Sequence, residues 1–218
     1  MSTNAPVRGA GRLGRRLVGL YAGLVLFGVS MALMLVSRLG LGPWDVLHQG
    51  LAARTGLPIG WIVVGVGALV LVLWVPLGQR PGLGTVSNVL VVGLAVDAAL
   101  AVLPQPRHLP VRLAFLVVGV VANGAATGLY IGAGLGPGPR DGLMTGLAGR
   151  GHSIRLVRTL IELSVLTVGW LLGGTVGAGT VLYAVSIGPL AQYFIPRLTV
   201  PLRQPTGSAV PHAGGDEM

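Results

Sequence analysis

Residues Leu39–Ala52 read LGLGPWDVLHQGLA, and residues Leu135–Ala148 read LGPGPRDGLMTGLA. Nine of the 14 positions are identical at a constant offset of 96 residues, where chance in this composition gives about one or two matches. A second match, after a one-residue adjustment to an offset of 95, pairs Gly82–Val86 with Gly177–Val181. The chain is therefore an internal duplication.

The composition of the chain excludes a water-soluble domain. It is 52% hydrophobic and only 10% charged, whereas a soluble domain carries about 25% charged residues to cover its surface. All 15 basic residues are arginine and the formal net charge is +9, but these arginines lie between apolar runs, as topology signals do. No polar region is large enough to display a nucleic-acid-binding face. We therefore expect the lipid bilayer as a partner, and no nucleic acid.

Six apolar segments are long enough to cross the bilayer, whose core of about 30 Å needs about 20 helical residues. These segments are 17–37, 59–77, 85–103, 113–133, 154–172 and 176–195. We predict an all-α integral membrane domain over 17–195, after an Arg-rich cytoplasmic segment (1–16) and before a disordered cytoplasmic tail (196–218). With this topology, 11 arginines lie in inside segments and four in outside segments. The positive-inside rule thus predicts a plasma-membrane protein with both termini in the cytoplasm.

The duplication and the number of spans together predict inverted repeats. Repeat 1 covers about 17–103 and repeat 2 about 113–195. Each repeat then holds three transmembrane helices, and an odd number makes the second repeat enter the membrane from the opposite side. The 14 residues from Pro43 to Gly56 are too few for a full span and include charged side chains. We therefore expect a short re-entrant or interfacial helix in each repeat.

Two stretches of the first repeat carry a resemblance to a known group of proteins. GLGPWDVLHQGLAARTG (40–56) and PGLGTVSNVLVVGLAVD (81–97) closely resemble the YczE-like bacterial membrane proteins, in the YczE/YyaS/YitT grouping. The resemblance extends over nearly all of residues 17–195. It implies a multi-pass protein of the bacterial plasma membrane, and it brings with it no reaction and no binding residues.

Each repeat contains one Gly-Pro-x-Asp element. The two elements are Gly42, Pro43, Trp44 and Asp45, and Gly138, Pro139, Arg140 and Asp141. Proline suits the first turn of a helix, and an acidic residue two positions later complements the positive helix end. One interpretation is two well-started short helices with structural roles. The other is two half-helices whose N-termini approach the midplane and line a polar cavity.

Asp97 and Gln192 occupy equivalent positions at the offset of 95, inside apolar segments. Asp97 lies 12 residues into its span, about 18 Å deep at the helical rise. An intramembrane carboxylate marks a functional site by default, and a hydrogen-bonded structural aspartate is the alternative. We predict that Asp45, Asp141, Asp97 and Gln192 line a pathway for a substrate or an ion.

Arg158 and Glu162 stand four residues apart in the most charged of the six segments. This spacing predicts an ion pair within one helix. The pair either neutralises the charges near the cytoplasmic end of the span or forms a gate or an anion contact.

These features favour a small transporter or permease-like protein of unassigned substrate. A non-transporting membrane scaffold or accessory factor is the alternative, and a homodimer is considered because six helices of a 218-residue chain form a thin bundle. The chain has no cysteine, and its histidines show no metal-ligand spacing. It also has no Gly-x-Ser-x-Gly nucleophile elbow and no His-Glu-x-x-His pair. We therefore expect no enzyme, no cofactor and no metal.

Overall fold

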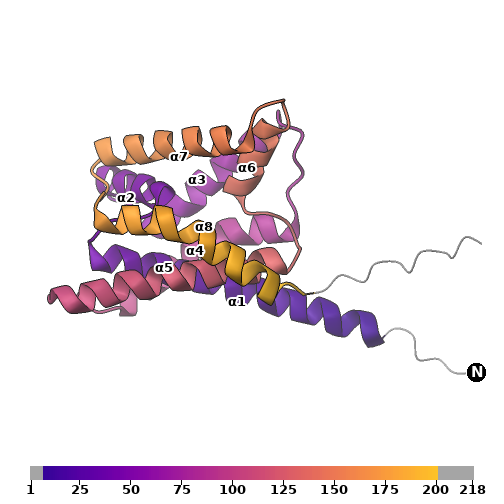
Figure 1. The fold of residues 1–218 in the computed structure, drawn as a ribbon, viewed down its shortest axis with the longest axis horizontal. Helices are drawn as coiled ribbons and strands as arrows, with labels where there is room; N and C mark the ends of the chain where they lie inside the picture. The colour runs from indigo at the N-terminus through magenta and orange to yellow at the C-terminus, as the bar shows by residue number, and fades with distance from the viewer. Residues whose placement is uncertain (1–6, 201–218) are drawn as a thin grey trace, which may run out of the picture.

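The computed structural model describes residues 7–200 of the chain, and all regular structure in this range is α-helical. The range holds eight helices, coloured from indigo to yellow in Figure 1. They are α1 (Val7–Ser37), α2 (Pro43–Thr55), α3 (Ile59–Trp74), α4 (Leu83–Val102), α5 (Leu109–Gly132), α6 (Pro139–Ala148), α7 (Ile154–Leu171) and α8 (Ala178–Leu198). The predicted all-α class is confirmed.

The Gly-Pro elements begin two short helices in the same way. Gly42 precedes α2 with φ −63° and ψ 155°, and Gly138 precedes α6 with φ −63° and ψ 157°. A proline follows each glycine, at the position where its missing N–H removes no bond within the helix. With 13 and 10 residues, the two helices are about 20 and 15 Å long, too short to cross a bilayer core alone.

The longer helices occupy the predicted apolar segments, but several ends differ from the prediction. α1 begins at Val7 rather than at Leu17, because arginine is a good helix former and the Arg-rich run does not interrupt the helix. α3 ends at Trp74 rather than at Leu77, because Pro76 has no N–H to continue the ladder. α8 runs to Leu198 and so includes the first residues of the predicted tail. The rest of that tail from 201, and residues 1–6, lie outside the described residues.

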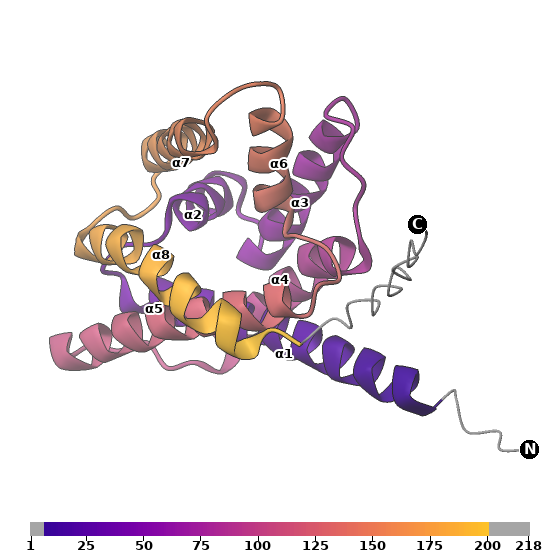
Figure 2. The ribbon, with the colours of Figure 1, turned by 45° about the vertical axis from the view of Figure 1, so that its right-hand side comes forward.

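The eight helices form two groups that face each other (Figure 2). The first group contains α1, α4, α5 and α8, in which α1 packs against α4 and α5, and α5 packs against α8. The second group contains α2, α3, α6 and α7, in which α2 packs against α7 and α3 packs against α6. The two groups are joined directly where α3 packs against α4. Each group thus contains two helices from each repeat, so the division in space cuts across the division in sequence.

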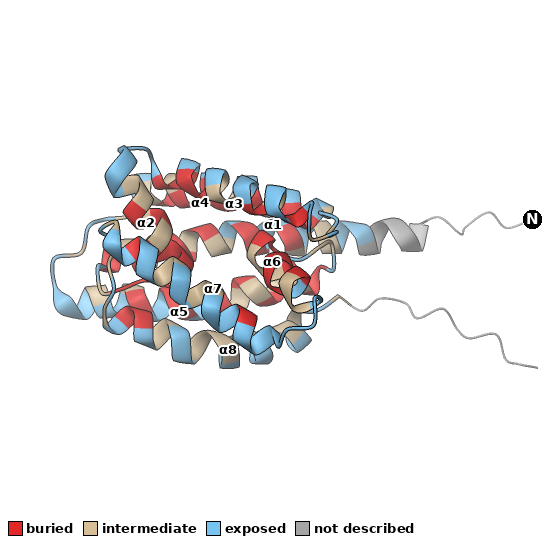
Figure 3. Ribbon diagram, turned by 90° about the horizontal axis from the view of Figure 1, so that it is seen from above, coloured by how far each residue is buried: buried red, intermediate tan, exposed pale blue. Residues whose placement is uncertain are grey.

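Burial differs strongly between the inner and outer faces of the helices (Figure 3). Leu20, Leu24 and Met31 of α1 are fully buried. Large apolar side chains such as Leu163 of α7 and Val185 of α8 are exposed. An apolar outer surface of this kind is unfavourable in water and suits contact with lipid tails.

Four helices of the described range are each long and apolar enough to cross a membrane, namely α1 (from Leu13), α4, α5 and α8. α2 and α3 form a fifth candidate if they are counted as one broken span, bent by 116°. α7 carries Arg155, Arg158 and Glu162 and does not meet the same criteria. The structure therefore contains four or five candidate spans, and the count of six stays a prediction.

Two arginines at equivalent positions tie each repeat to the other. Arg16 in α1 donates hydrogen bonds of 2.7 and 2.6 Å to the carbonyl groups of residues 133–134. Arg112 in α5 donates bonds of 2.7 and 3.0 Å to the carbonyl groups of residues 37–38. The donor residue of one set is 96 residues from the donor residue of the other, and the same offset separates the corresponding acceptor residues. The contact made by one repeat is therefore returned by the other.

The backbone repeats this exchange at the starts of α4 and α8. The N–H of Gly84 donates to the carbonyl oxygen of Leu135 at 2.8 Å, and the N–H of Gly179 donates to that of Leu39 at 2.8 Å. These residues are again equivalent in the duplication, at offsets of 95 and 96. Both bonds satisfy N–H groups in the first turn of a helix, which have no partner inside the helix itself.

Candidate functional site

A cavity of about 340 Å³ is lined by residues from all eight helices, and therefore from both helix groups. Its polar lining residues are Trp44, His48, Asn88, Thr127, Tyr130, Arg140, Asp141, Arg158, Glu162, Tyr183 and Gln192. Much of the remaining wall is aliphatic. The volume falls within the range of about 300–1,000 Å³ that is typical of small-molecule sites.

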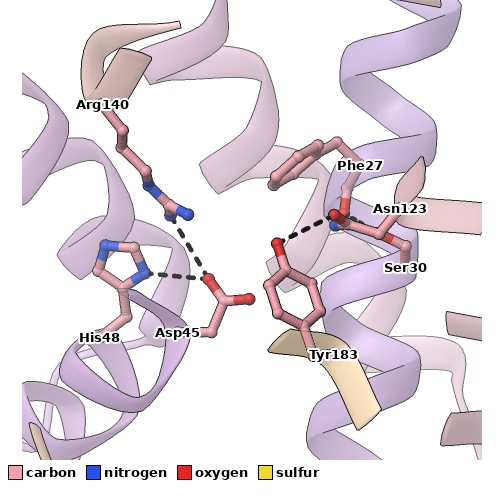
Figure 4. A network of polar contacts seen from close by, with 7 residues as sticks. All are labelled: Phe27, Ser30, Asp45, His48, Asn123, Arg140 and Tyr183. Carbon is pink, nitrogen blue, oxygen red and sulfur yellow. Dashed lines mark hydrogen bonds and ion pairs between the residues drawn. The ribbon is translucent and has the colours of Figure 1, made fainter. Parts of the chain in front are cut away.

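An ionic cluster joins the first turns of α2 and α6 beside this cavity (Figure 4). Asp45 is only 2% exposed. Its Oδ1 lies 3.4 Å from Nη2 of Arg140 and 3.6 Å from Nδ1 of His48. An unpaired buried charge costs several kcal/mol, so Arg140 stabilises the buried carboxylate of the other repeat.

Trp44 and Arg140 occupy the same place in the two repeats and contact each other. The guanidinium carbon of Arg140 lies 5.1 Å from the ring centroid of Trp44, within the range of a cation–π interaction. The indole Nε1 of Trp44 is buried and has no hydrogen-bond partner in the described part of the chain. A sequence difference between the repeats is therefore also a point of contact between them.

A hydrogen-bonded chain connects the cavity with the first helix group (Figure 4). The hydroxyl of Tyr183 in α8 donates to Oδ1 of Asn123 in α5 at 3.3 Å, and Nδ2 of Asn123 donates to Oγ of Ser30 in α1 at 2.9 Å. Ser30 in turn donates to the carbonyl oxygen of Phe27 at 2.7 Å. Buried amides need such partners, and this chain fixes three helices around the cavity.

Two further polar contacts lie on the cavity wall. The hydroxyl of Tyr130 in α5 donates to Oδ2 of Asp141 at 3.0 Å. Nε of Arg158 donates to Oε1 of Glu162 at 2.8 Å within α7, as the sequence spacing predicted. Charged groups from α6 and α7 therefore face the same space as the aromatic side chains.

The structure separates the four residues that were predicted to line one pathway. Asp141 and Gln192 line the cavity, whereas Asp45 does not line it and pairs with the lining residue Arg140. Asp97 is not among the lining residues. Its Oδ1 instead accepts a hydrogen bond of 2.8 Å from the backbone N–H of Gly60, in the first turn of α3, which gives an otherwise unpaired helix-end N–H a partner. This contact of Asp97 is the one expected of a hydrogen-bonded structural aspartate, which was the alternative to a pathway residue.

Several polar side chains of the site are not identified by the sequence analysis, among them Asn88, Thr127 and the three considered next. Asn123, Tyr130 and Tyr183 lie inside apolar segments, and a polar group at such a position is itself a signal of function or of specific pairing. That signal was available for Asn123, the only amide of its helix. The partners of these side chains are set by contacts between distant parts of the chain. The two partners of Asn123, for example, are 60 and 93 residues away in the sequence, and the sequence alone does not specify such contacts.

An all-helical chain with several apolar helices and a charged cavity between them defines a multi-pass membrane protein. Residues 14–196 match the family described as "Family of unknown function (DUF6198)", and the chain belongs to this family. No solved structure matches the chain.

Three curated proteins are similar to most of the chain. An uncharacterized protein of Haemophilus influenzae is 43% identical over 173 residues, covering 79% of each chain. The uncharacterized membrane protein YczE of Bacillus subtilis is 33% identical over 181 residues, covering 81% of this chain and 84% of YczE. The uncharacterized protein YyaS of the same bacterium is 28% identical over 181 residues, covering 80% and 89%. The resemblance to the YczE-like proteins is confirmed.

Proposed function

We propose that this protein is a small, non-enzymatic membrane transporter whose substrate binds in the cavity between the two helix groups. The observation that carries the proposal is the lining itself: one chain surrounds the cavity with side chains from all eight helices, including two arginines and two carboxylates. Charged groups are unfavourable inside a bilayer and are retained there for substrate or ion pathways. Because one chain supplies the whole lining, the proposal does not require a homodimer.

The proposed topology is a single domain over residues 17–195 in the plasma membrane, with six spans, two inverted repeats and both termini in the cytoplasm. The reciprocal bonds of Arg16 and Arg112 support a two-fold relation between the repeats. The shortness of α2 and α6 supports their assignment as re-entrant or interfacial helices. With three spans in each repeat, a two-fold axis in the membrane plane follows.

The proposed mechanism is a relative movement of the two helix groups around the cavity. Transporters built from inverted repeats expose a fixed midplane site to one side and then to the other by rocking one bundle against its partner. Here the pairs that would separate or shift during the movement are those that link the groups, such as Tyr130 of α5 with Asp141 of α6. The ion pair of Arg158 and Glu162 lies within α7 and would move with its group.

Cysteine accessibility tests this proposal, since the native chain contains no cysteine. A single cysteine at Gln192, which lines the cavity, is exposed to a membrane-impermeant maleimide in right-side-out and in inverted vesicles. We expect labelling from both faces, because the cavity opens to each in turn. A cysteine at Leu24, which is fully buried, is the matched control and should stay unlabelled.

The same measurement distinguishes the alternative function. Labelling of position 192 from neither face would favour a membrane scaffold with a closed core. Labelling from one face only would contradict transport and leave a one-sided binding protein. C-terminal reporter fusions check the topology, and periplasmic activity of alkaline phosphatase after Arg197 would contradict six spans.

A further inference from the structure

The charged groups of the cavity leave one carboxylate without a cationic partner. Arg158 pairs with Glu162 at 2.8 Å and Arg140 pairs with Asp45 at 3.4 Å. Asp141 makes no ion pair within residues 7–200, and its contact is the hydroxyl of Tyr130 at 3.0 Å. A carboxylate in an enclosed site within a membrane domain needs a compensating positive charge. The cavity therefore has a place for a cation beside Asp141.

The same cavity also leaves hydrogen-bond donors without acceptors. Trp44 is 7% exposed and lines the cavity, and its Nε1–H has no partner in the described chain. An indole N–H can only donate, so it needs an acceptor. Arg140, beside it, has five N–H groups. Within the described residues its one side-chain hydrogen bond is the long bond to Asp45. Nδ1 of His48, at 3.6 Å from Asp45, also has no hydrogen-bond partner among residues 7–200.

Much of the rest of the cavity lining is aliphatic. Its lining side chains include Val63, Val66 and Val70 of α3 and Val89 and Val92 of α4. Such a wall favours an apolar group through the removal of apolar surface from water. A ligand that fits the cavity therefore combines one positive group, one acceptor group and one apolar body.

We propose that the cavity binds an aliphatic α-amino acid as a zwitterion, which specifies the substrate class of the proposed transporter and rests on that function. The ammonium group pairs with Asp141, and the carboxylate accepts hydrogen bonds from Trp44 and Arg140. Arg140 and Asp141 are neighbours in the first turn of α6, so they present opposite charges close together. A simple amine would leave the indole N–H unpaired, and a simple carboxylate would face the charge of Asp141.

Three matched probes test this inference on the purified full-length protein by isothermal titration calorimetry. They are L-leucine, 3-methylbutylamine, which is leucine without its carboxylate, and 4-methylpentanoate, which is leucine without its ammonium group. We expect leucine to bind and each of the other two to bind at least about a hundredfold more weakly, because each leaves either the buried indole N–H or the carboxylate of Asp141 unpaired.

Two variants assign the ends of the ligand. Asp141→Asn should weaken leucine binding about a hundredfold and leave 4-methylpentanoate no weaker than before. Trp44→Phe should weaken leucine binding about tenfold and leave 3-methylbutylamine unchanged, because the smaller ring keeps an aromatic face and lacks the indole N–H that would bind the carboxylate. Trp170→Phe is the control, since Trp170 is 62% exposed and lies outside the cavity lining, and it should bind leucine as the native chain does. If Asp141→Asn does not fold, the selective effect of Trp44→Phe decides.

Equal affinity for leucine and 3-methylbutylamine would overturn the inference in favour of a cation site. Equal affinity for leucine and 4-methylpentanoate would overturn it in favour of an anion site. The absence of binding by all three probes to the folded protein would also overturn it. The result is independent of vesicle labelling: labelling from both faces without leucine binding refutes the substrate class alone, and leucine binding with labelling from one face refutes transport alone.

Discussion

The first turns of α2 and α6 share their backbone geometry and differ in their surroundings. The preceding glycines have the same φ of −63° and ψ values of 155° and 157°. Asp45 is nearly inaccessible and lies beside Arg140 and His48. Asp141 is half-buried and contacts the hydroxyl of Tyr130. One carboxylate is therefore committed to an ion pair, and its equivalent remains free to meet a ligand.

This difference shows how a duplicated element acquires two roles. The glycine, the proline and the aspartate set the start of the helix, and both copies contain them. Two of the five positions that differ, Trp44 against Arg140 and His48 against Met144, line the cavity in both copies. The backbone requirement is thus common to the two elements, and the chemistry lies in the side chains between the shared positions.

The largest expected effect comes from giving α6 a residue of α2. Gly142 is the equivalent of Val46, and a Cβ at Gly142 would overlap the indole of Trp74. That indole is 1% exposed and donates to the carbonyl oxygen of Pro139 at 3.0 Å. Gly142→Val should therefore lower the free energy of unfolding by about 3 kcal/mol or more, measured by thermal unfolding in detergent.

The matched control for this prediction is Gly65→Val in α3, where a Cβ would have no neighbour within 4 Å. We expect a change within about 0.5 kcal/mol. If Gly142→Val were as stable as the control, the close contact between α6 and α3 would not exist in the membrane protein.

The next largest effect tests the commitment of Asp45. Arg140→Gln removes the cation 3.4 Å from a buried carboxylate and should lower the free energy of unfolding by about 3 kcal/mol. Adding Asp45→Asn in the same chain should restore most of this loss, because no charge is then left buried. Chemical denaturation of the two single variants and the double variant measures the coupling, and additive effects would argue against the pair.

A smaller effect is expected at the other carboxylate. Tyr130→Phe removes the hydroxyl that donates to Asp141 at 3.0 Å and should lower the free energy of unfolding by about 1 kcal/mol. Tyr193→Phe is the control, since Tyr193 is 53% exposed, and it should be neutral within about 0.5 kcal/mol. A loss at Tyr130 as large as that at Arg140 would remove the contrast between the two carboxylates.

The smallest effect is expected from the exposed ion pair of α7. The side chains of Arg158 and Glu162 are 54% and 33% exposed, so Glu162→Gln should change the free energy of unfolding by about 0.5 kcal/mol or less. The change should decrease further as salt is added, because exposed pairs are screened. A loss above 2 kcal/mol, on the order of a buried pair, would show that this pair is enclosed.

The sequence predicted the helices well because their signals are local. Apolar length, a proline in the first turn and a glycine before it act within a few residues, and α2 and α6 begin at Pro43 and Pro139 as these signals indicate. The differences arise at ends where length alone was used, such as α1, which continues backward through the Arg-rich segment to Val7.

The site was predicted only in part because partners are set by tertiary contacts. The depth of Asp97 within an apolar segment was visible, but its acceptance of a bond from Gly60, 37 residues away, depends on the close approach of α3 and α4. The chain from Tyr183 through Asn123 to Ser30 joins three helices and has no sequence motif. The aligned sequences show that Trp44 and Arg140 differ between the repeats, whereas their contact follows from the relation of the repeats in space.

The reciprocal bonds between the repeats have a consequence for biosynthesis. While the ribosome has made only the first repeat, the carbonyl groups of residues 37–38 lack their donor, Arg112. The N–H of Leu41 likewise lacks its acceptor, the hydroxyl of Thr180, 139 residues later. Unpaired backbone groups are not tolerated in lipid. We therefore expect the first repeat to stay in contact with water or with the insertion machinery until the second emerges, and the two repeats to complete each other as a late step of membrane insertion.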